Sequence, residues 1–270
     1  GTKNPSGEAD PIIVHPDVRR MLLTQKAFAE GNRMLVYYLA SQLDLVEHPE
    51  PSIRQAAKTR LDFMTPIAKA FATETGFESA NLALQCFGGH GYIREWGVEQ
   101  NVRDARIAML YEGTTGVQAL DLLSRKVLGS GGVMLEQFLA EVEAFCASAA
   151  SGRHAPDFID QLRVLIDEWR EISALVGESA QDDPDLIGAA SVNYLMYAGY
   201  VALAYFWARA ATRSADNIAS LDEPAAFYSA KIATARFYYE QILPRTRTCV
   251  AGIRAGSGSL MALEEAHFAF

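Results

Sequence analysis

Apolar residues recur at three- and four-residue steps along almost the whole chain, which is the period of an amphipathic α-helix. The first such stretch begins at Pro16 or Asp17 and ends before Pro49 and Pro51. No segment alternates apolar and polar residues over more than a few positions, as a half-buried strand would. The pattern therefore predicts an all-α protein.

Prolines and glycines divide this pattern into separate helices. Ser52 is a candidate N-cap for a second helix, and Thr65-Pro66 predicts that this helix restarts or kinks. A third helical segment ends at Gly88-Gly89, and residues 110–113 form a loop. Further helices are expected at about residues 98–107, 114–127, 133–150, 156–177, 184–213, 224–241 and 244–255, the last four beginning near prolines.

The glycine-rich run Gly129-Ser-Gly-Gly132 is the clearest hinge in the chain. We therefore expect a loop or linker over residues 1–14, a first helical domain over residues 15–128, a hinge over residues 129–133 and an additional helical domain over residues 134–270.

Residues 188–208 contain no charged side chain, and these 21 positions would be long enough to cross a bilayer. Four tyrosines are spread along the middle of the stretch, where a membrane span would place few of them, because tyrosine prefers the membrane interfaces. We predict a central helix of a helical bundle, buried on most sides, and no membrane span.

Composition narrows the function further. Half of the 270 residues are apolar, and the formal net charge is −9, which disfavours a nucleic-acid-binding surface. Three scattered cysteines show no metal-binding or disulfide spacing, so we expect no metal site and a reducing, cytoplasmic location. The chain begins with Gly rather than Met, and we expect it to be the C-terminal part of a longer protein.

Two loops carry residues that a simple bundle does not need. Gly88-Gly89 either ends a helix with a left-handed cap or lets a ligand approach the backbone closely. In Tyr111-Glu112-Gly113-Thr114-Thr115 a carboxylate lies just before a helix start. Glu112 is either a side chain favoured by the helix dipole or a general base held in a cleft beside free backbone N–H groups.

Three segments resemble, in their order and spacing, the C-terminal helical domain of the acyl-CoA dehydrogenases: Gln85-Cys-Phe-Gly-Gly-His-Gly-Tyr92, Val102-Arg-Asp-Ala-Arg-Ile107 and Leu110-Tyr-Glu-Gly-Thr-Thr-Gly-Val-Gln118. The extension beyond them resembles the longer bacterial members, which act on long-chain acyl-CoA or methylmercaptopropionyl-CoA. The resemblance implies an incomplete C-terminal four-helix-bundle domain of that fold, followed by a second helical bundle.

The resemblance also implies a flavoenzyme of fatty-acid β-oxidation. In this family non-covalently bound FAD lies across a subunit interface, and an acyl-CoA is oxidised to the trans-2-enoyl-CoA. Glu112 would be the base that removes the α-proton while a hydride passes to FAD. Its backbone N–H would donate a hydrogen bond to the thioester oxygen.

The remaining roles are carried over residue by residue. Gln85, Gly88 and Gly89 match positions near the adenosine half of FAD, and Thr114 matches a hydroxyl near the phosphate and ribose region of the flavin. Gln118 is either a further FAD contact or a residue of the helix surface or of an interface. Tyr111 and Gly113 would border the substrate. An Arg103–Asp104 salt bridge is expected to fix the loop before Glu112.

The implied partners are an acyl-CoA, an electron-transfer flavoprotein and further copies of the chain in a homodimer or homotetramer, with no nucleic acid. An acyl-CoA oxidase shares the base and the flavin, and a non-catalytic helical oligomerisation or interaction module is a further alternative. Without the domains that normally precede this one, we expect the chain alone to be inactive.

Overall fold

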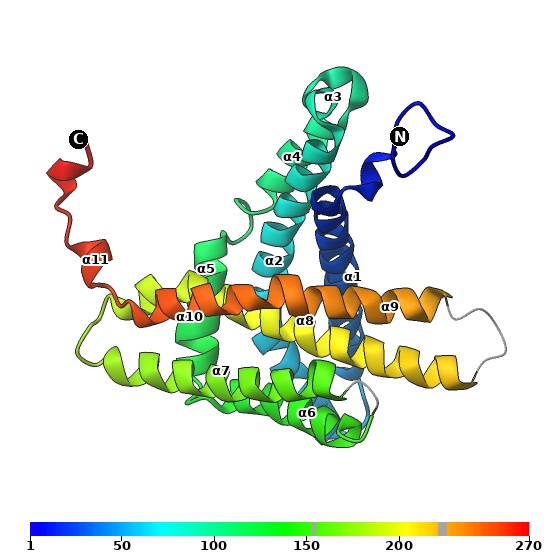
Figure 1. The fold of residues 1–270 in the computed structure, drawn as a ribbon. Helices are drawn as coiled ribbons and strands as arrows, with labels where there is room; N and C mark the ends of the chain where they lie inside the picture. Colours follow the sequence, from blue (N-terminus) through cyan, green and yellow to red (C-terminus); the bar gives the residue numbers. More distant parts are fainter. Residues whose placement is uncertain (153–154, 221–225, 270) are drawn as a thin grey trace.

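The computed structural model describes residues 1–152, 155–220 and 226–269, and these residues form helices and no strand (Figure 1). The all-α prediction is therefore confirmed. The α-helices are α1 (Pro16–Leu45), α2 (Pro51–Phe87), α3 (Gly89–Tyr92), α4 (Val98–Ile107), α5 (Thr115–Leu120), α6 (Val133–Ala149), α7 (Asp160–Ser179), α8 (Leu186–Ser220), α9 (Ala226–Phe237), α10 (Thr246–Arg254) and α11 (Gly258–Met261). Short 3-10 helices are η1 (Ile12–Val14), η2 (Arg94–Trp96), η6 (Leu243–Arg245) and η7 (Glu265–Ala269), and π-helical turns are η3 (Asp121–Leu128), η4 (Ala155–Ile159) and η5 (Tyr238–Ile242).

Helix α2 differs from its prediction in two ways. Its N-cap is Glu50, whose side chain accepts a hydrogen bond from the backbone N–H of Ser52 at 3.4 Å, so the prediction that Ser52 caps the helix is wrong. The helix also continues through Pro66, so the predicted restart there is wrong. Proline removes one helical hydrogen bond. Pro66 is buried, and packing against neighbouring helices decides such cases more than local propensity does.

Helix α8 lies between the first helices and the last ones (Figure 1), packing on α1, α2 and α5 as well as on α7, α9 and α10. It begins at Leu186 rather than at Pro184, and the predicted start of the next helix at Pro224 lies outside the described residues. Trp207 of α8 is fully buried and donates its indole N–H to the carbonyl of Ala27 in α1 at 3.2 Å. One hydrophobic core therefore continues across the turn at residues 129–132.

Helix α8 is also long and apolar enough to cross a membrane, and 67% of its most apolar window is buried inside the fold. The hydroxyl of the buried Tyr197 donates to the carbonyl of Leu165 at 2.7 Å. Burial of the tyrosines on this helix raises their pKa values, so they stay neutral donors. These contacts are those of a central core helix.

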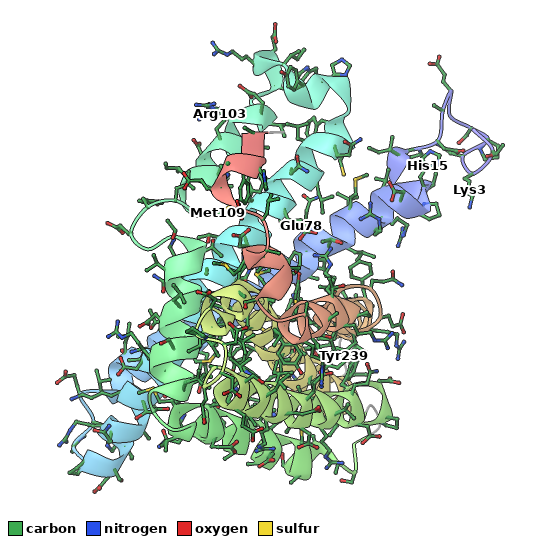
Figure 2. The ribbon with its side chains drawn as sticks, turned by 90° about the vertical axis from the view of Figure 1, so that its left-hand side faces the viewer. Lys3, His15, Glu78, Arg103, Met109 and Tyr239 are labelled. Carbon is green, nitrogen blue, oxygen red and sulfur yellow. The ribbon has the colours of Figure 1, made fainter. Side chains whose placement is uncertain are left out.

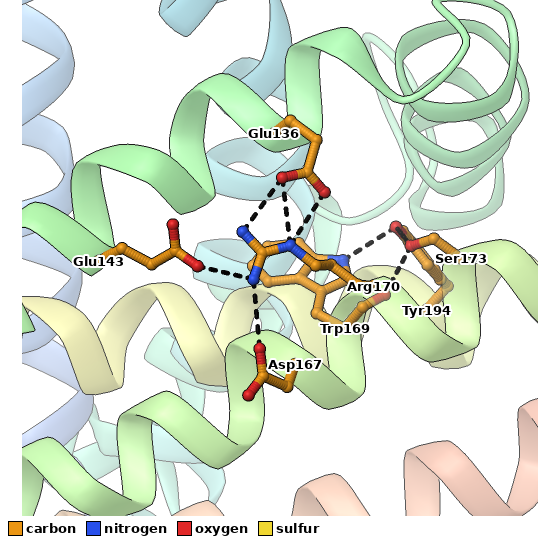
Figure 3. Close-up of polar contacts among 7 residues, drawn as sticks. All are labelled: Glu136, Glu143, Asp167, Trp169, Arg170, Ser173 and Tyr194. Carbon is orange, nitrogen blue, oxygen red and sulfur yellow. Dashed lines mark hydrogen bonds and ion pairs between the residues drawn. The ribbon is translucent and has the colours of Figure 1, made fainter.

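Polar contacts join α6, α7 and α8 (Figure 3). The indole of Trp169 donates to the hydroxyl of Tyr194 at 2.8 Å, and Ser173 lies 2.6 Å from the same hydroxyl. Arg170 pairs with Glu136 at 3.0 Å, and also with Glu143 and Asp167. The indole N–H of the fully buried Trp169 needs such a partner, because a buried donor without a hydrogen bond would lose its contacts with water and gain nothing in return.

Three ion pairs tie this second group of helices to the first, and one of them joins Lys231 of α9 to Glu30 of α1 at 2.8 Å. Glu141 of α6 accepts hydrogen bonds from Tyr38 at 3.0 Å and from Arg60 at 2.8 Å. Arg245, which follows α9, forms a two-pronged pair with Glu78 of α2, both distances being 2.8 Å. We call α1, α2 as far as residue 79, α5, η3 and the described residues from 133 to 254 the body.

The end of α2, together with α3, η2 and α4 (residues 80–107), projects from the body (Figure 1). We call this part the arm. Helix α4 has no buried residue, and Phe87, Tyr92 and Trp96 near the tip are 50%, 78% and 55% exposed.

Candidate active site

Glu112 lies in the loop of residues 108–114, which leads from the end of the arm back to the body at α5. Its φ angle is +50°, the one positive value for a non-glycine among the described residues, and Gly113 follows at +96°. A side chain in this left-handed region costs roughly 1–2 kcal/mol. The surrounding contacts must therefore hold Glu112 in place.

Helix α5 begins directly after this loop and is capped by Thr114. The Thr114 hydroxyl accepts a hydrogen bond from the backbone N–H of Val117 at 3.4 Å. Thr114 is therefore the N-cap of α5, and Glu112 lies two residues before it, outside the first turn of the helix. The carboxylate of Glu112 remains available for other chemistry.

Helix α2 holds both ends of the loop. The ammonium of Lys69 donates to the carbonyl of Ala108 at 2.9 Å and to the carbonyl of Gly113 at 2.5 Å. Five residues further along α2, Glu74 accepts a hydrogen bond from the hydroxyl of Thr115 at 2.6 Å. Neither side chain was predicted from the sequence. The available signal was a lysine within the otherwise apolar run from Pro66 to Phe71.

The expected Arg103–Asp104 salt bridge is wrong for the described residues. Arg103 is exposed on the outside of α4 (Figure 2), and Asp104 instead accepts a hydrogen bond from Gln100 at 2.7 Å. Consecutive residues of a helix point in different directions, so they rarely face each other. At the end of α4, Arg106 donates to the Met109 sulfur at 3.3 Å and lies over the Phe77 ring of α2.

Gln118 and Gly113 meet across the start of α5. A Cβ placed on Gly113 would lie only 2.2 Å from the Gln118 side-chain nitrogen, so the end of the Gln118 side chain would have to move, and the φ angle of +96° itself favours glycine here. Gln118 also lines a groove of about 580 Å³ along α5, with Val117, Leu120, Asp121, Ser124 and Arg125.

The expectation that Glu112 is buried in a cleft is not met within this chain. Glu112 is exposed, and the adjacent Tyr111 is 53% exposed. The apolar residues Ile107, Leu110 and Val117 beside the loop are also more than half exposed. Any cleft around Glu112 must be completed by another part of the protein or by another chain.

Gln85, Gly88 and Gly89 lie together at the tip of the arm. Gly88 ends α2 at a φ angle of +59°, and its N–H donates to the carbonyl of Gln85 at 3.0 Å. Gly88 has a ψ angle of −142°, so it ends the helix outside the left-handed helical conformation that was predicted. A Cβ on either glycine would meet no atom within 4 Å, so the space beside both is open.

The structure does not bring this tip together with the Glu112 loop. Lys69 contacts the loop, and Gln85 lies 16 residues further along the same helix, a rise of about 24 Å. The predicted residues thus form two clusters: Tyr111, Glu112, Gly113, Thr114 and Gln118 in one, and Gln85, Gly88 and Gly89 in the other.

Comparisons with known proteins match both halves of the chain. Residues 2–128 match the family model described as acyl-CoA dehydrogenase, C-terminal domain, and residues 138–264 match acetyl-CoA dehydrogenase C-terminal like. The chain shares the fold of Caenorhabditis elegans ACDH-11, crystallised in complex with C11-CoA, with a TM-score of 0.64 and 22% identity over 81% of this chain and 35% of that one.

Among curated relatives, the chain is 39% identical to 3-methylmercaptopropionyl-CoA dehydrogenase of Ruegeria pomeroyi, over 87% of this chain and 40% of that protein. It is 35% identical to the broad-specificity linear acyl-CoA dehydrogenase FadE5 of Mycobacterium tuberculosis, over 95% of this chain and 44% of that protein. The chain therefore belongs to the acyl-CoA dehydrogenase family. It spans about two fifths of the length of these relatives.

Proposed function

We propose that this chain is the C-terminal part of a flavin-dependent acyl-CoA dehydrogenase in which Glu112 is the catalytic base. The observation that carries the proposal is the conformation of Glu112. It is a non-glycine residue at a φ angle of +50°, in a loop that Lys69 holds at both ends. Strained residues of this kind cluster at active sites.

Glu112 would remove a proton from the carbon next to the thioester of an acyl-CoA, giving the trans-2-enoyl-CoA as product. Such a proton is weakly acidic, so the site must stabilise negative charge on the thioester oxygen as the proton leaves. The backbone N–H of Glu112 is a suitable donor, because the described residues provide it with no other hydrogen-bond acceptor.

The residues of the arm fit the adenosine half of FAD. Gly88 and Gly89 present open backbone, and Gln85 adds an exposed amide at the same helix end. When bound, FAD would accept the hydride that leaves the β-carbon of the substrate. Thr114 is less free for such a contact, because its hydroxyl already caps α5.

The distance between the two clusters supports an assembly of two or more copies. A base at the loop and a cofactor-binding tip about 24 Å away along one helix fit a site shared between subunits. In that arrangement each chain supplies its loop to one site and its arm to a neighbouring site. The exposed apolar residues of both regions are suited to such a contact.

The test is made on the whole protein that contains this chain. Flavin absorbance is followed without oxygen while acyl-CoAs of different length and polarity are added. We expect one of them to bleach the flavin of the wild type. In Glu112→Gln the bleaching rate should fall by 10²–10⁴-fold, the range of general-base catalysis, with flavin content unchanged.

Glu47→Gln is the matched control, because Glu47 is an exposed glutamate in the turn after α1, outside both clusters. It should leave the bleaching rate unchanged. Equal rates in Glu112→Gln and wild type would contradict the proposal. Re-oxidation by oxygen with release of peroxide, rather than by an electron-transfer flavoprotein, would identify an oxidase. Absence of flavin would favour the helical interaction module.

The isolated 270-residue chain should bind FAD weakly or not at all and should show no turnover. Its base is exposed to water, and its two clusters lie too far apart to enclose one substrate. A yellow preparation of the chain that bleaches with acyl-CoA would contradict this expectation.

A further inference from the structure

We infer that Lys69 is a positioning residue for the loop that carries Glu112. This inference rests on the proposed function, since it concerns the same reaction. Lys69 lies in the middle of α2, at a half-buried position between the buried residues Ile67 and Ala70. Among the described residues its ammonium has two hydrogen-bond partners, and both are backbone carbonyls of the loop.

The first carbonyl belongs to Ala108, the residue that ends α4. The last carbonyls of a helix lack helical partners and carry the negative end of its dipole, so a cation is favoured there. Lys69 therefore fixes the point at which the chain leaves the arm.

The second carbonyl belongs to Gly113, the residue directly after Glu112. Because one ammonium holds Ala108 and Gly113 at the same time, opening of the loop or sliding along α2 would break at least one of these hydrogen bonds. The φ angles of +50° at Glu112 and +96° at Gly113 lie within this closed loop. The shape of the loop sets where the Glu112 carboxylate and the Glu112 backbone N–H point.

Glu74 completes the attachment from the other side of the loop. Its carboxylate accepts the Thr115 hydroxyl at 2.6 Å, at the first residue of α5. The segments before and after Glu112 are thus both attached to helix α2. Loss of Lys69 would leave the body folded and release only the segment around Glu112.

The experiment compares Lys69→Met, Lys69→Arg and the control Lys58→Met in the whole protein. Lys58 is exposed on the same helix. We expect Lys69→Met to slow flavin reduction by acyl-CoA on the order of 10²-fold, the effect of a displacement of about 1 Å at a reacting group. The KM for acyl-CoA and the flavin content should stay within about twofold of wild type.

Lys69→Arg keeps two N–H donors on a longer side chain and should recover part of the lost rate. Lys58→Met should match the wild type. A wild-type rate in Lys69→Met would overturn the inference, and so would a loss of kcat that arginine does not relieve at all. If Lys69→Met does not accumulate as folded protein, Lys69→Leu, which likewise has no donor, takes its place with the same expectations.

A second measurement separates failure of this inference from failure of the proposed function. Hydrogen exchange of the amides of residues 110–116 is measured in the wild type, Lys69→Met and Lys58→Met. Faster exchange at these amides in Lys69→Met alone supports the positioning role, even if no acyl-CoA reduces the wild-type flavin. Equal exchange in all three proteins overturns it.

Discussion

Helices α8 and α4 represent two kinds of region within this chain. In α8 almost every side chain from Tyr197 to Ala208 is buried, and its tyrosines and tryptophan find hydrogen-bond partners inside the fold. In α4 no residue is buried, and the arm around it exposes large apolar side chains to solvent. The body buries its apolar side chains within the chain, whereas the arm and the Glu112 loop leave theirs exposed to a ligand or to another chain.

This difference fits the division of roles proposed above. The body supplies stability and a rigid helix, α2, on which the loop is fixed. The arm contributes little to the core and has the exposed apolar residues of an interaction surface. Substitutions of buried residues in the body should destabilise the chain, and matched substitutions in the arm should leave its stability nearly unchanged.

The largest contrast is expected between two tryptophans. Trp207→Ala removes a fully buried indole that also donates to Ala27, and should destabilise the isolated chain by about 3–5 kcal/mol. Trp96→Ala removes an indole that is 55% exposed and should change stability by about 0.5 kcal/mol or less. Urea unfolding followed by circular dichroism measures both. Similar losses in the two variants would show that the arm is part of the core.

Cysteine reactivity should show a contrast of about a hundredfold. Burial raises the pKa of the Cys146 and Cys249 thiols to about 11, from an ordinary value near 9, so at pH 8 their reactive thiolate is about a hundredfold scarcer. Cys86, in the arm, is only partly buried and should be alkylated first by iodoacetamide.

The raised pKa of the two buried thiols predicts how their alkylation depends on pH. Because the folded-state pKa is raised, alkylation of the two body cysteines should speed up about tenfold per pH unit until the pH approaches about 11. Peptide mass spectrometry after timed labelling measures each site. Labelling of Cys146 at the rate of Cys86 at pH 8 would contradict the burial of α6.

Two glycines give the smallest contrast. A Cβ on Gly199 of α8 would lie 2.1 Å from the ring of Phe71 in α2, so Gly199→Ala should cost about 1–3 kcal/mol through overpacking. Gly89→Ala has open space around it and lies in α3, so it should be neutral or stabilise slightly. Thermal unfolding of both variants sharpens the comparison, and equal melting temperatures would contradict the close packing of α8 on α2.

Most of the helices were predictable because each one carries its own signal. The spacing of apolar residues predicted α4 with the bounds Val98–Ile107, and the glycines after Phe87 marked the end of α2. The errors came in α2, at one position where a neighbouring residue took the role of the cap and at another where packing outweighed a local preference. Ser52 is typical of a helix N-cap, yet Glu50 provides the cap of α2. Pro66 is typical of a helix start, yet it is buried within α2, which continues on both sides of it.

The candidate site divides in the same way. The order of residues alone pointed to Glu112, to the glycines at the arm tip and to the family, because short motifs are properties of the sequence. The tertiary structure decided which neighbours those residues have. It placed Lys69 and Glu74 against the loop, left Arg103 exposed and separated the arm tip from the base. Lys69 and Gly113 are 44 residues apart, and only the packing of α2 beside the loop, which no local pattern encodes, brings them together.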